Sequence, residues 1–114
     1  MPRMTHEEWV ANGRAAAVAT AKRMQSGELG IIEGSRMLTA LSHHIESGAI
    51  ATLFTPFVVI ESDTDHFPIG LQESMWAPAA LAERRGAIAM AEDLHRSDAL
   101  NACAALIEWL EHDV

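Results

Sequence analysis

Apolar and small residues recur three and four positions apart in the first quarter of the chain, a spacing typical of an amphipathic helix. The residues that share this face are Trp9, Gly13, Ala16, Ala17, Thr20 and Met24. Thr5 and Glu8 have the spacing of a capping box, in which a hydroxyl and a carboxylate bind the free N–H groups of a first helical turn. Gly27 suits the left-handed conformation that ends many helices. We therefore predict a first helix from Thr5 to Ser26.

A second apolar seam follows directly, and we predict a helix from about Glu28 to Ser47 with Gly48 as its stop. The seam consists of Ile31, Gly34, Leu38, Leu41 and Ile45. Gly30 and Gly34 form a G-x-x-x-G pattern. In a helix that is not in a membrane, this pattern indicates close packing, here against the alanine-rich face of the first helix. Two helices joined by a short turn predict an antiparallel αα-hairpin.

The middle of the chain, residues 49–77, is ambiguous between helix and strand. Its apolar cluster contains Phe54, Phe57, Val58, Val59 and Ile60. Thr55 and Pro56 suit the start of a short helix, whereas the Val-Val-Ile run favours a strand. Because the chain offers no second strand to pair with, we expect a short helical turn. The segment from Glu61 to Gly70 then has the composition of a turn-rich loop.

The last third of the chain is again helical in its pattern. Pro78 is well placed to open a helix, and Gly86 and Ser97 are the two positions at which a helix can be interrupted. We predict a short helix that ends at about Arg84 and then a long helix to about Glu111. Ser97 is the alternative start of a separate last helix.

These elements predict an all-α fold: a small helical bundle made of an αα-hairpin, an irregular acidic loop and a long C-terminal helix. The 114 residues, 49% of them hydrophobic and 21% charged, are enough for a single helical domain, residues 1–114, that folds without metal or disulfide. Tyrosine is absent and aromatic residues make up only 5%, which argues against a β-sandwich or a barrel.

Charge narrows the range of partners. Eight Lys and Arg against sixteen Asp and Glu give a net charge of −8, which repels phosphate backbones and acidic membrane surfaces. No apolar run approaches the roughly 18 residues that span a bilayer. We therefore expect neither nucleic acid nor a membrane as a main partner. Cys103 is the only cysteine, and the first residues lack the apolar region of a secretory signal, so we expect a cytoplasmic protein.

The acidic loop is the strongest candidate site. Glu61, Asp63, Asp65 and His66 place three carboxylates and an imidazole within six residues, a set that can hold a divalent cation. The order of these residues does not fit an EF-hand. The composition is more typical of Asp and Ser side chains that bind the backbone of their own turn, and partner binding is a third interpretation. We predict no metal and no cofactor.

Arg36 lies among apolar neighbours in the second predicted helix. A half-buried guanidinium requires a carboxylate partner, and Glu61 or Asp63 would tie the acidic loop to the hairpin. The alternative is an exposed Arg36 whose stem lies on the surface. Trp76, which follows the loop, completes the set of candidate interaction or structural residues.

Other chemistry-bearing residues give little support to catalysis. The partial metal motifs are His43-His44 with Glu46, and Glu92 with His95. Metal sites in helical bundles need more such motifs from separate helices. Cys103 lies in an apolar stretch typical of a buried thiol, and we predict no catalytic residue.

The segment Phe57–Gly70, together with Trp76–Leu81, resembles a small bacterial helical family whose function is not established. Members carry an Ile-x-Ser-Glu-Thr-Asp-x-x-Pro-x-Gly loop followed by a Trp and a terminal helix, and Asp63 here takes the place of the Glu. Gly34-Ser35-Arg36 resembles the Gly-x-Arg helix segment of the family. The resemblance covers about half the chain and implies no activity. Toxin-immunity and other interaction proteins are the analogy that it suggests.

Three functions remain open at this point. The first and best supported is a non-catalytic interaction protein, of an immunity-like kind, whose acidic surface steers a basic partner such as a nuclease toxin. The second is a divalent-metal-dependent enzyme that uses Asp63, Asp65 and His66 of the acidic loop, with His43 as a further ligand. The third is a homodimeric structural domain. The Ala- and Leu-rich surface of so short a chain predicts a two-fold homodimer, with the terminal helix or its Trp109 end in the interface.

Overall fold

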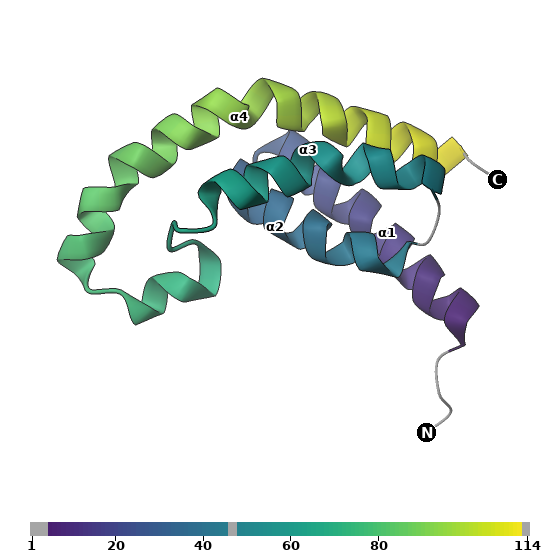
Figure 1. Cartoon of the computed structure of the whole chain (residues 1–114), viewed down its shortest axis with the longest axis horizontal. Helices are drawn as coiled ribbons and strands as arrows, with labels where there is room; N and C mark the ends of the chain where they lie inside the picture. The colour runs from purple at the N-terminus through teal and green to yellow at the C-terminus, as the bar shows by residue number, and fades with distance from the viewer. Residues whose placement is uncertain (1–4, 46–47, 113–114) are drawn as a thin grey trace.

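The computed structural model describes residues 5–45 and 48–112, which form helices and connecting turns. The α-helices are α1 (His6–Ser26), α2 (Ile31–Leu41), α3 (Gly48–Thr64) and α4 (Pro78–His112), and two short 3₁₀ helices are η1 (Ser42–His44) and η2 (Gly70–Met75). No strand occurs in these residues, so the predicted all-α bundle is confirmed. The first three α-helices pack with one half of α4, and the other half of α4 extends away from them (Figure 1).

The predicted ends of α1 are confirmed, although the Glu8 carboxylate binds the Thr5 hydroxyl and not a free N–H group as the predicted capping box requires. The Thr5 hydroxyl accepts a hydrogen bond from the N–H of Glu8 at 3.1 Å and donates one to the Glu8 carboxylate, also at 3.1 Å. Gly27 has a φ of 83°, and its N–H bonds to the carbonyl of Met24. This left-handed residue turns the chain towards α2, so the αα-hairpin forms as expected.

The second helix is shorter than predicted. It begins at Ile31 rather than Glu28, because Gly27 to Gly30 are used by the turn. It ends at Leu41, and Ile45 has extended backbone angles that stop the helical run after η1. The predicted end, Ser47, lies outside the described residues. The prediction that Gly48 ends this helix is wrong, because Gly48 is the first residue of α3.

The third helix corrects the expected organisation of the middle of the chain. A helix of 17 residues with Pro56 in its interior replaces the expected short turn. A proline removes one helix hydrogen bond, and the buried apolar face of α3 offsets this loss. That face consists of Ile50, Phe54, Phe57 and Ile60. Because α3 continues to Thr64, Glu61 and Asp63 lie on its last turn and not in a loop.

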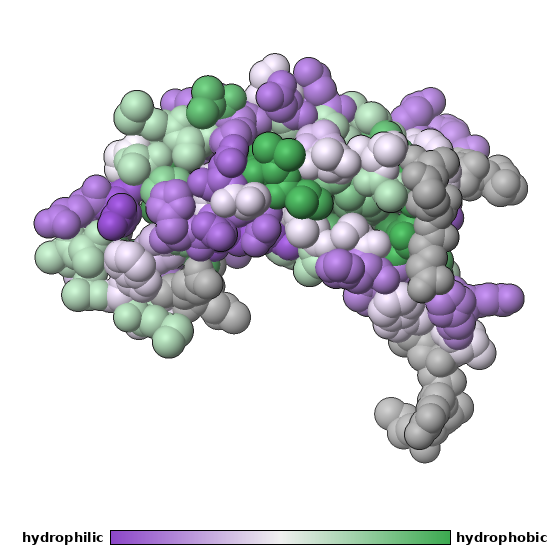
Figure 2. Space-filling model, in the orientation of Figure 1, coloured by the Kyte–Doolittle hydropathy of each residue, from purple (hydrophilic) through white to green (hydrophobic). Residues whose placement is uncertain are grey.

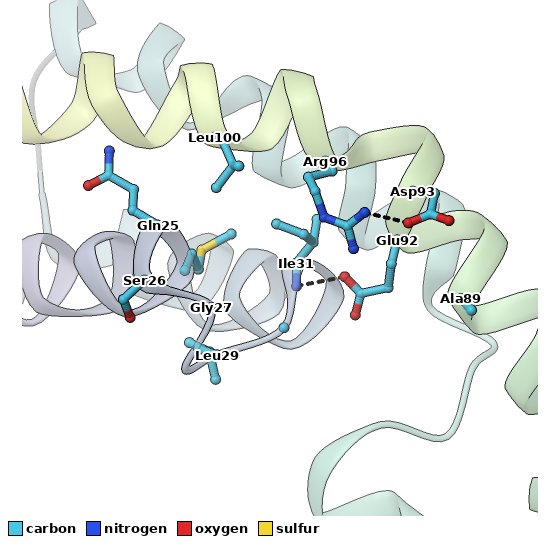
Figure 3. A pocket seen from close by; sticks show the side chains of 12 residues that line it. Gln25, Ser26, Gly27, Leu29, Ile31, Ala89, Glu92, Asp93, Arg96 and Leu100 are labelled. Atoms are coloured by element: carbon cyan, nitrogen blue, oxygen red, sulfur yellow. Dashed lines mark hydrogen bonds and ion pairs between the residues drawn. The ribbon is translucent and has the colours of Figure 1, made fainter.

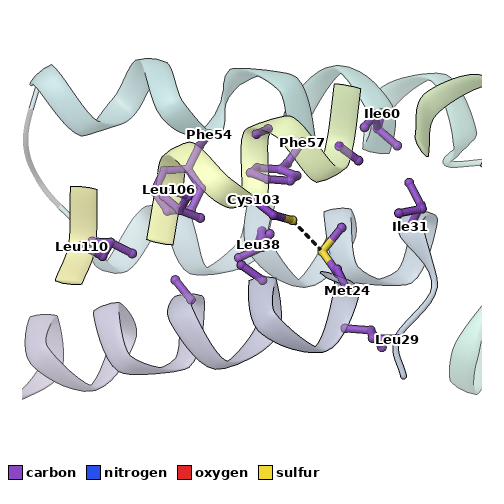
Figure 4. Close-up of a cluster of buried hydrophobic side chains, with 14 of the residues drawn as sticks. Met24, Leu29, Ile31, Leu38, Phe54, Phe57, Ile60, Cys103, Leu106 and Leu110 are labelled. Atoms are coloured by element: carbon purple, nitrogen blue, oxygen red, sulfur yellow. Dashed lines mark hydrogen bonds between the residues drawn. The ribbon is translucent and has the colours of Figure 1, made fainter. Parts of the chain in front are cut away.

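The core fills the space between the four α-helices (Figure 4). Here the Cys103 thiol of α4 donates to the Met24 sulfur of α1 at 3.7 Å. A Cβ on Gly34 would lie 2.4 Å from the same sulfur. The close packing predicted for the G-x-x-x-G pattern is therefore present at Gly34, with Met24 as the neighbour in place of an alanine.

The last helix is continuous over 35 residues from Pro78 to His112. Pro78 opens it as predicted, but the expected break after Arg84 and the alternative break at Ser97 are both absent. A glycine such as Gly86 weakens a helix by about 1 kcal/mol and does not by itself end one. None of the described helices combines the length and the apolarity that crossing a membrane requires.

Burial divides α4 into two halves. The buried residues of this helix are Ala99, Ala102, Cys103, Leu106 and Leu110. Residues 78–98, which contain no buried residue, are called the arm below. Figure 1 shows the arm curving away from the bundle and back towards α3 through η2. The segment that joins α3 to α4 therefore lies at one end of the molecule, beside the arm and η2.

Candidate functional site

The segment that joins α3 to α4 forms a hollow of about 430 Å³ at the end of the molecule. The residues that line it, called the tip below, are Asp65, His66, Phe67, Pro68, Met75 and Trp76. The turn begins where the N–H of Phe67 bonds to the carbonyl of Thr64 at 3.1 Å. It closes after η2, where the N–H of Trp76 bonds to the carbonyl of Glu73 at 3.2 Å. Three predicted site residues, Asp65, His66 and Trp76, therefore line one hollow.

The lining of the tip combines apolar, aromatic and acidic groups. Phe67 and Pro68 are buried and form its base, whereas Met75 is 85% exposed and Trp76 is 36% exposed. The imidazole of His66 lies against the Phe67 ring, with 4.2 Å between the ring centroids. This arrangement offers apolar contact area together with the negative charge of Asp65.

Arg36 ties the tip to α2. Its Nη2 atom donates to the carbonyl oxygens of Thr64 at 2.5 Å and of Phe67 at 2.9 Å. The first of these carbonyls lies at the C-terminal end of α3, where the helix dipole favours a cation. Arg36 thus connects the acidic segment to the hairpin as predicted, and in these two bonds the acceptors are main-chain oxygens rather than the expected Glu61 or Asp63 carboxylates.

Asp63 and Glu61 belong to α3, whereas Asp65 and His66 of the same predicted acidic cluster line the tip. Asp63 lies on the last turn of α3, and its Oδ2 atom is 3.8 Å from Nε2 of His95 on α4. The carboxylate is 60% exposed, whereas the His95 side chain is only 14% exposed. The expectation that Asp63 binds the backbone of its own turn is wrong, because this part of the chain is helical. Glu61 lies half-buried on the same turn.

Glu92 and His95, which form one of the partial metal motifs, make contacts with other parts of the chain. Glu92 and His95 share a helix face, but Glu92 accepts a hydrogen bond from the N–H of Ile31 at 2.7 Å (Figure 3). His95 lies near Asp63 instead. Within the part of the chain that the structure describes, no three His, Cys, Asp or Glu side chains are grouped so that they could hold a metal ion.

His44 packs against the first helix, which the sequence patterns did not indicate. Its ring stacks on Trp9, with 4.0 Å between the centroids and 20° between the planes. A Cβ on Gly13 would lie 2.4 Å from the Cβ of His44, so a glycine is needed there. The Nδ1 atom of His44 is buried and has no hydrogen-bond partner among residues 5–45 and 48–112. The carboxylate predicted to share a helix face with His43 is that of Glu46, and Glu46 lies outside the described residues.

The single cysteine has the environment predicted for it. Cys103 is buried in the core, and this burial raises the pKa of its thiol to about 11. The thiol therefore stays neutral at physiological pH, and a neutral thiol is a poor nucleophile.

The arm is the main feature that sequence patterns did not single out. Met90 and Leu94 on the arm are each 75% exposed. A hollow of about 490 Å³ separates the base of the arm from the α1–α2 turn, and Glu92 and Arg96 line it (Figure 3). In the sequence, the helical periodicity could identify Met90 and Leu94 as neighbours, but it could not show that α4 leaves the bundle there. Compared with protein-family models, with curated proteins and with solved structures, the chain shows no match.

Proposed function

We propose that this chain is a non-catalytic interaction protein that binds a basic protein partner at the tip. The observation that carries this proposal is the hollow of about 430 Å³, in which the exposed Met75 and Trp76 side chains are combined with the carboxylate of Asp65. Exposed tryptophans that border a hollow are typical of the residues that contribute most to binding energy.

The lining of the tip favours an arginine or lysine side chain from the partner. The aliphatic stem of such a residue packs on apolar groups such as Met75. Its charged head is attracted both by the face of a Trp ring and by a carboxylate, here those of Trp76 and Asp65. The net charge of −8 accelerates the approach of a basic surface from a distance.

The contacts of Arg36 hold the tip in place before a partner arrives. Because its guanidinium binds the carbonyls of Thr64 and Phe67, the turn that contains Asp65 and His66 is fixed at both ends. A surface that is already ordered loses less conformational entropy when it binds. This supports a role in recognition for the segment that the sequence resemblance singled out.

Three narrower statements belong to the same proposal. An immunity-like role, with a basic nuclease toxin as the partner, rests on the acidic charge and on the bacterial resemblance. A cytoplasmic location rests on the single cysteine, which the structure buries. A homodimer is proposed because the arm of α4 leaves the apolar side chains of Met90 and Leu94 exposed.

Affinity capture from a lysate of the source organism, followed by reconstitution with the purified captured protein, tests the proposal. We expect a basic protein whose binding weakens as salt is added. In calorimetry, Trp76→Ala and Asp65→Asn should weaken binding by about tenfold or more, equivalent to about 1.4 kcal/mol. Trp9→Ala and Glu108→Gln are matched controls, since Trp9 is as exposed as Trp76 and Glu108 is exposed on α4.

Two results would overturn the proposal. The first is the absence of any basic protein that binds the purified wild-type chain. The second is a basic partner that binds the Trp76→Ala and Asp65→Asn variants as tightly as the wild type.

A further inference from the structure

The arm presents an apolar face that nothing in the described chain covers. Met90 and Leu94 lie one turn apart, and a hollow of about 540 Å³ is lined by Met90, Ala91, Asp93 and Leu94. In Figure 2 apolar residues lie along the arm at the left of the molecule, interspersed with hydrophilic ones. Large apolar side chains grouped on a surface are typical of sites where another protein binds.

Gly86 lies one turn before Met90 on the same face. Nothing lies within 4 Å of the Cβ that a larger residue would carry there. A glycine in an exposed helix costs about 1 kcal/mol relative to alanine, and no contact with the part of the chain that the structure describes requires it at this position. A second helix that passes close to Gly86 would give the missing side chain a structural role.

Positions four, seven and eleven residues on either side of Met90 share its face of α4. At 3.6 residues per turn, the positions on this face are Ala79, Glu83, Gly86, Met90, Leu94, Ser97 and Asn101. They form three pairs equally distant from Met90, namely Gly86 with Leu94, Glu83 with Ser97, and Ala79 with Asn101. Two copies of the arm that cross antiparallel at Met90 therefore place Leu94 of each copy over Gly86 of the other.

The low net charge of the arm favours a second copy as the occupant of this face. Residues 78–98 carry four acidic side chains and three arginines, so the arm has a net charge of −1 although the whole chain carries −8. The acidic residues are Glu83, Glu92, Asp93 and Asp98, and the arginines are Arg84, Arg85 and Arg96. In the antiparallel register, Glu83 faces Ser97 and Asp93 faces Ala87, so no like charges are paired on the Met90 face. Arg84 of one copy is level with Arg96 of the other, but both lie about 120° around the helix from Met90. A basic partner gains little electrostatic attraction from this arm, whereas a second arm meets little repulsion on that face.

The other predicted interface is already used within the chain. Arg14 lies over the Trp109 ring at 5.4 Å, and Lys22 Nζ lies 2.5 Å from a carboxylate oxygen of Glu111. The Trp109 end of α4 thus packs against α1, while the arm end of the same helix stays uncovered.

We infer that two copies of this chain pair through their arms, antiparallel and with Met90 on the two-fold axis. The inference rests on the proposed homodimer and is independent of the proposed partner at the tip. A contact between one pair of helices is at the small end of protein interfaces, so we expect dissociation in the micromolar range.

Disulfide trapping of cysteine variants tests this register. Met90→Cys should form a disulfide-linked dimer under mild oxidation, because the two sulfurs meet at the axis. Ala79→Cys alone should not, since its two copies lie 22 residues apart along the pair, about 33 Å. A mixture of the Ala79→Cys and Asn101→Cys variants should cross-link. The buried Cys103 has a raised pKa and stays unreacted.

Three other outcomes would overturn the antiparallel register, the homodimer or both. Cross-linking of Ala79→Cys with itself would show parallel pairing. A wild-type dimer in sedimentation that Met90→Cys fails to trap would keep the homodimer and overturn the register. A wild-type chain that stays monomeric into the high micromolar range would overturn both, and it would leave the proposed partner at the tip unaffected.

Discussion

The carboxylate of Glu92 in α4 caps the first turn of α2, with its Oε2 atom accepting the N–H of Ile31 at 2.7 Å (Figure 3). The N-cap residue of α2 is Gly30, which has no side chain to fill this role. A Cβ on Gly30 would lie 2.9 Å from the other carboxylate oxygen, so the glycine leaves room for Glu92. This long-range cap fixes the base of the arm to the hairpin and so sets where α4 leaves the bundle.

Removal of this cap should lower the stability of the whole bundle. We expect Glu92→Ala to reduce the free energy of unfolding by about 1–2 kcal/mol, because both the N–H bond and the favourable charge at the helix N-terminus are lost. Glu92→Gln keeps an acceptor and should lose less. Urea unfolding measures both, with Glu108→Ala as the exposed control on the same helix. Wild-type stability in Glu92→Ala would show that the cap contributes nothing.

A methyl group at Gly34 should be poorly tolerated. The added Cβ would lie 2.4 Å from the buried Met24 sulfur, so α1 and α2 would have to move apart. We expect Gly34→Ala to destabilise the protein by about 1–3 kcal/mol. Gly86→Ala is the matched control: its new Cβ meets nothing, and better helix propensity should stabilise the monomer by up to about 1 kcal/mol. Equal melting temperatures for the two variants at low concentration would contradict this packing.

The Arg36 contacts should matter more for stability than the acidic side chains do. Arg36→Ala leaves the Thr64 and Phe67 carbonyls without this donor, and we expect a loss of about 1–3 kcal/mol. Asp63→Ala should change stability by no more than about 1 kcal/mol, because its carboxylate is mostly exposed and lies 3.8 Å from His95. Chemical denaturation of the two variants checks this order. The reverse order would mean that the carboxylate, not the main chain, anchors the segment.

Alkaline pH should destabilise the protein through Cys103. The thiol ionises near pH 9.0 in the unfolded chain and at about 11 in the folded one. Between these values the unfolded state releases a proton that the folded state retains, so the free energy of unfolding should fall as pH rises from about 9 to 11. The chain has no tyrosine and a single lysine, so few other groups titrate there. Unfolding at several pH values should show a decline that Cys103→Ala lacks, and an identical decline in that variant would assign the effect elsewhere.

Sequence signals that act within a few residues predict the ends of α1 correctly. Features that depend on tertiary packing are not predicted correctly from the sequence. Thr5 and Gly27 act within a few residues, and both helix ends appear where the sequence predicts them. By their own propensity, Gly48 predicts a helix end and Pro56 the start of a short helix, but packing of the apolar face of α3 accommodates the proline inside one helix that extends to Thr64. As a result, Glu61 and Asp63 lie in α3, whereas Asp65 and His66 lie in the turn that follows it.

The same limit applies to the candidate site. Asp65, His66 and Trp76 follow one another closely enough for sequence reasoning to group them, and they do line one hollow. The cap by Glu92 spans 61 positions, and no local pattern signals such a contact. The exposure of Met90 likewise depends on the point at which α4 leaves the other helices. The hydrophobic periodicity of a single helix carries no information about that point.

Sedimentation equilibrium of the wild-type chain beside Gly86→Gln tests the central claim, that the arm is a binding surface filled by a second copy. Glutamine favours a helix more than glycine does, so the variant should fold at least as stably at low concentration. It should place a side chain where Leu94 of the partner packs. The account predicts a wild-type dimer that dissociates in the micromolar range and a variant whose dissociation constant is about tenfold higher or more, equivalent to about 1.4 kcal/mol. A monomeric wild type, or a variant that dimerises as tightly as the wild type, would contradict it.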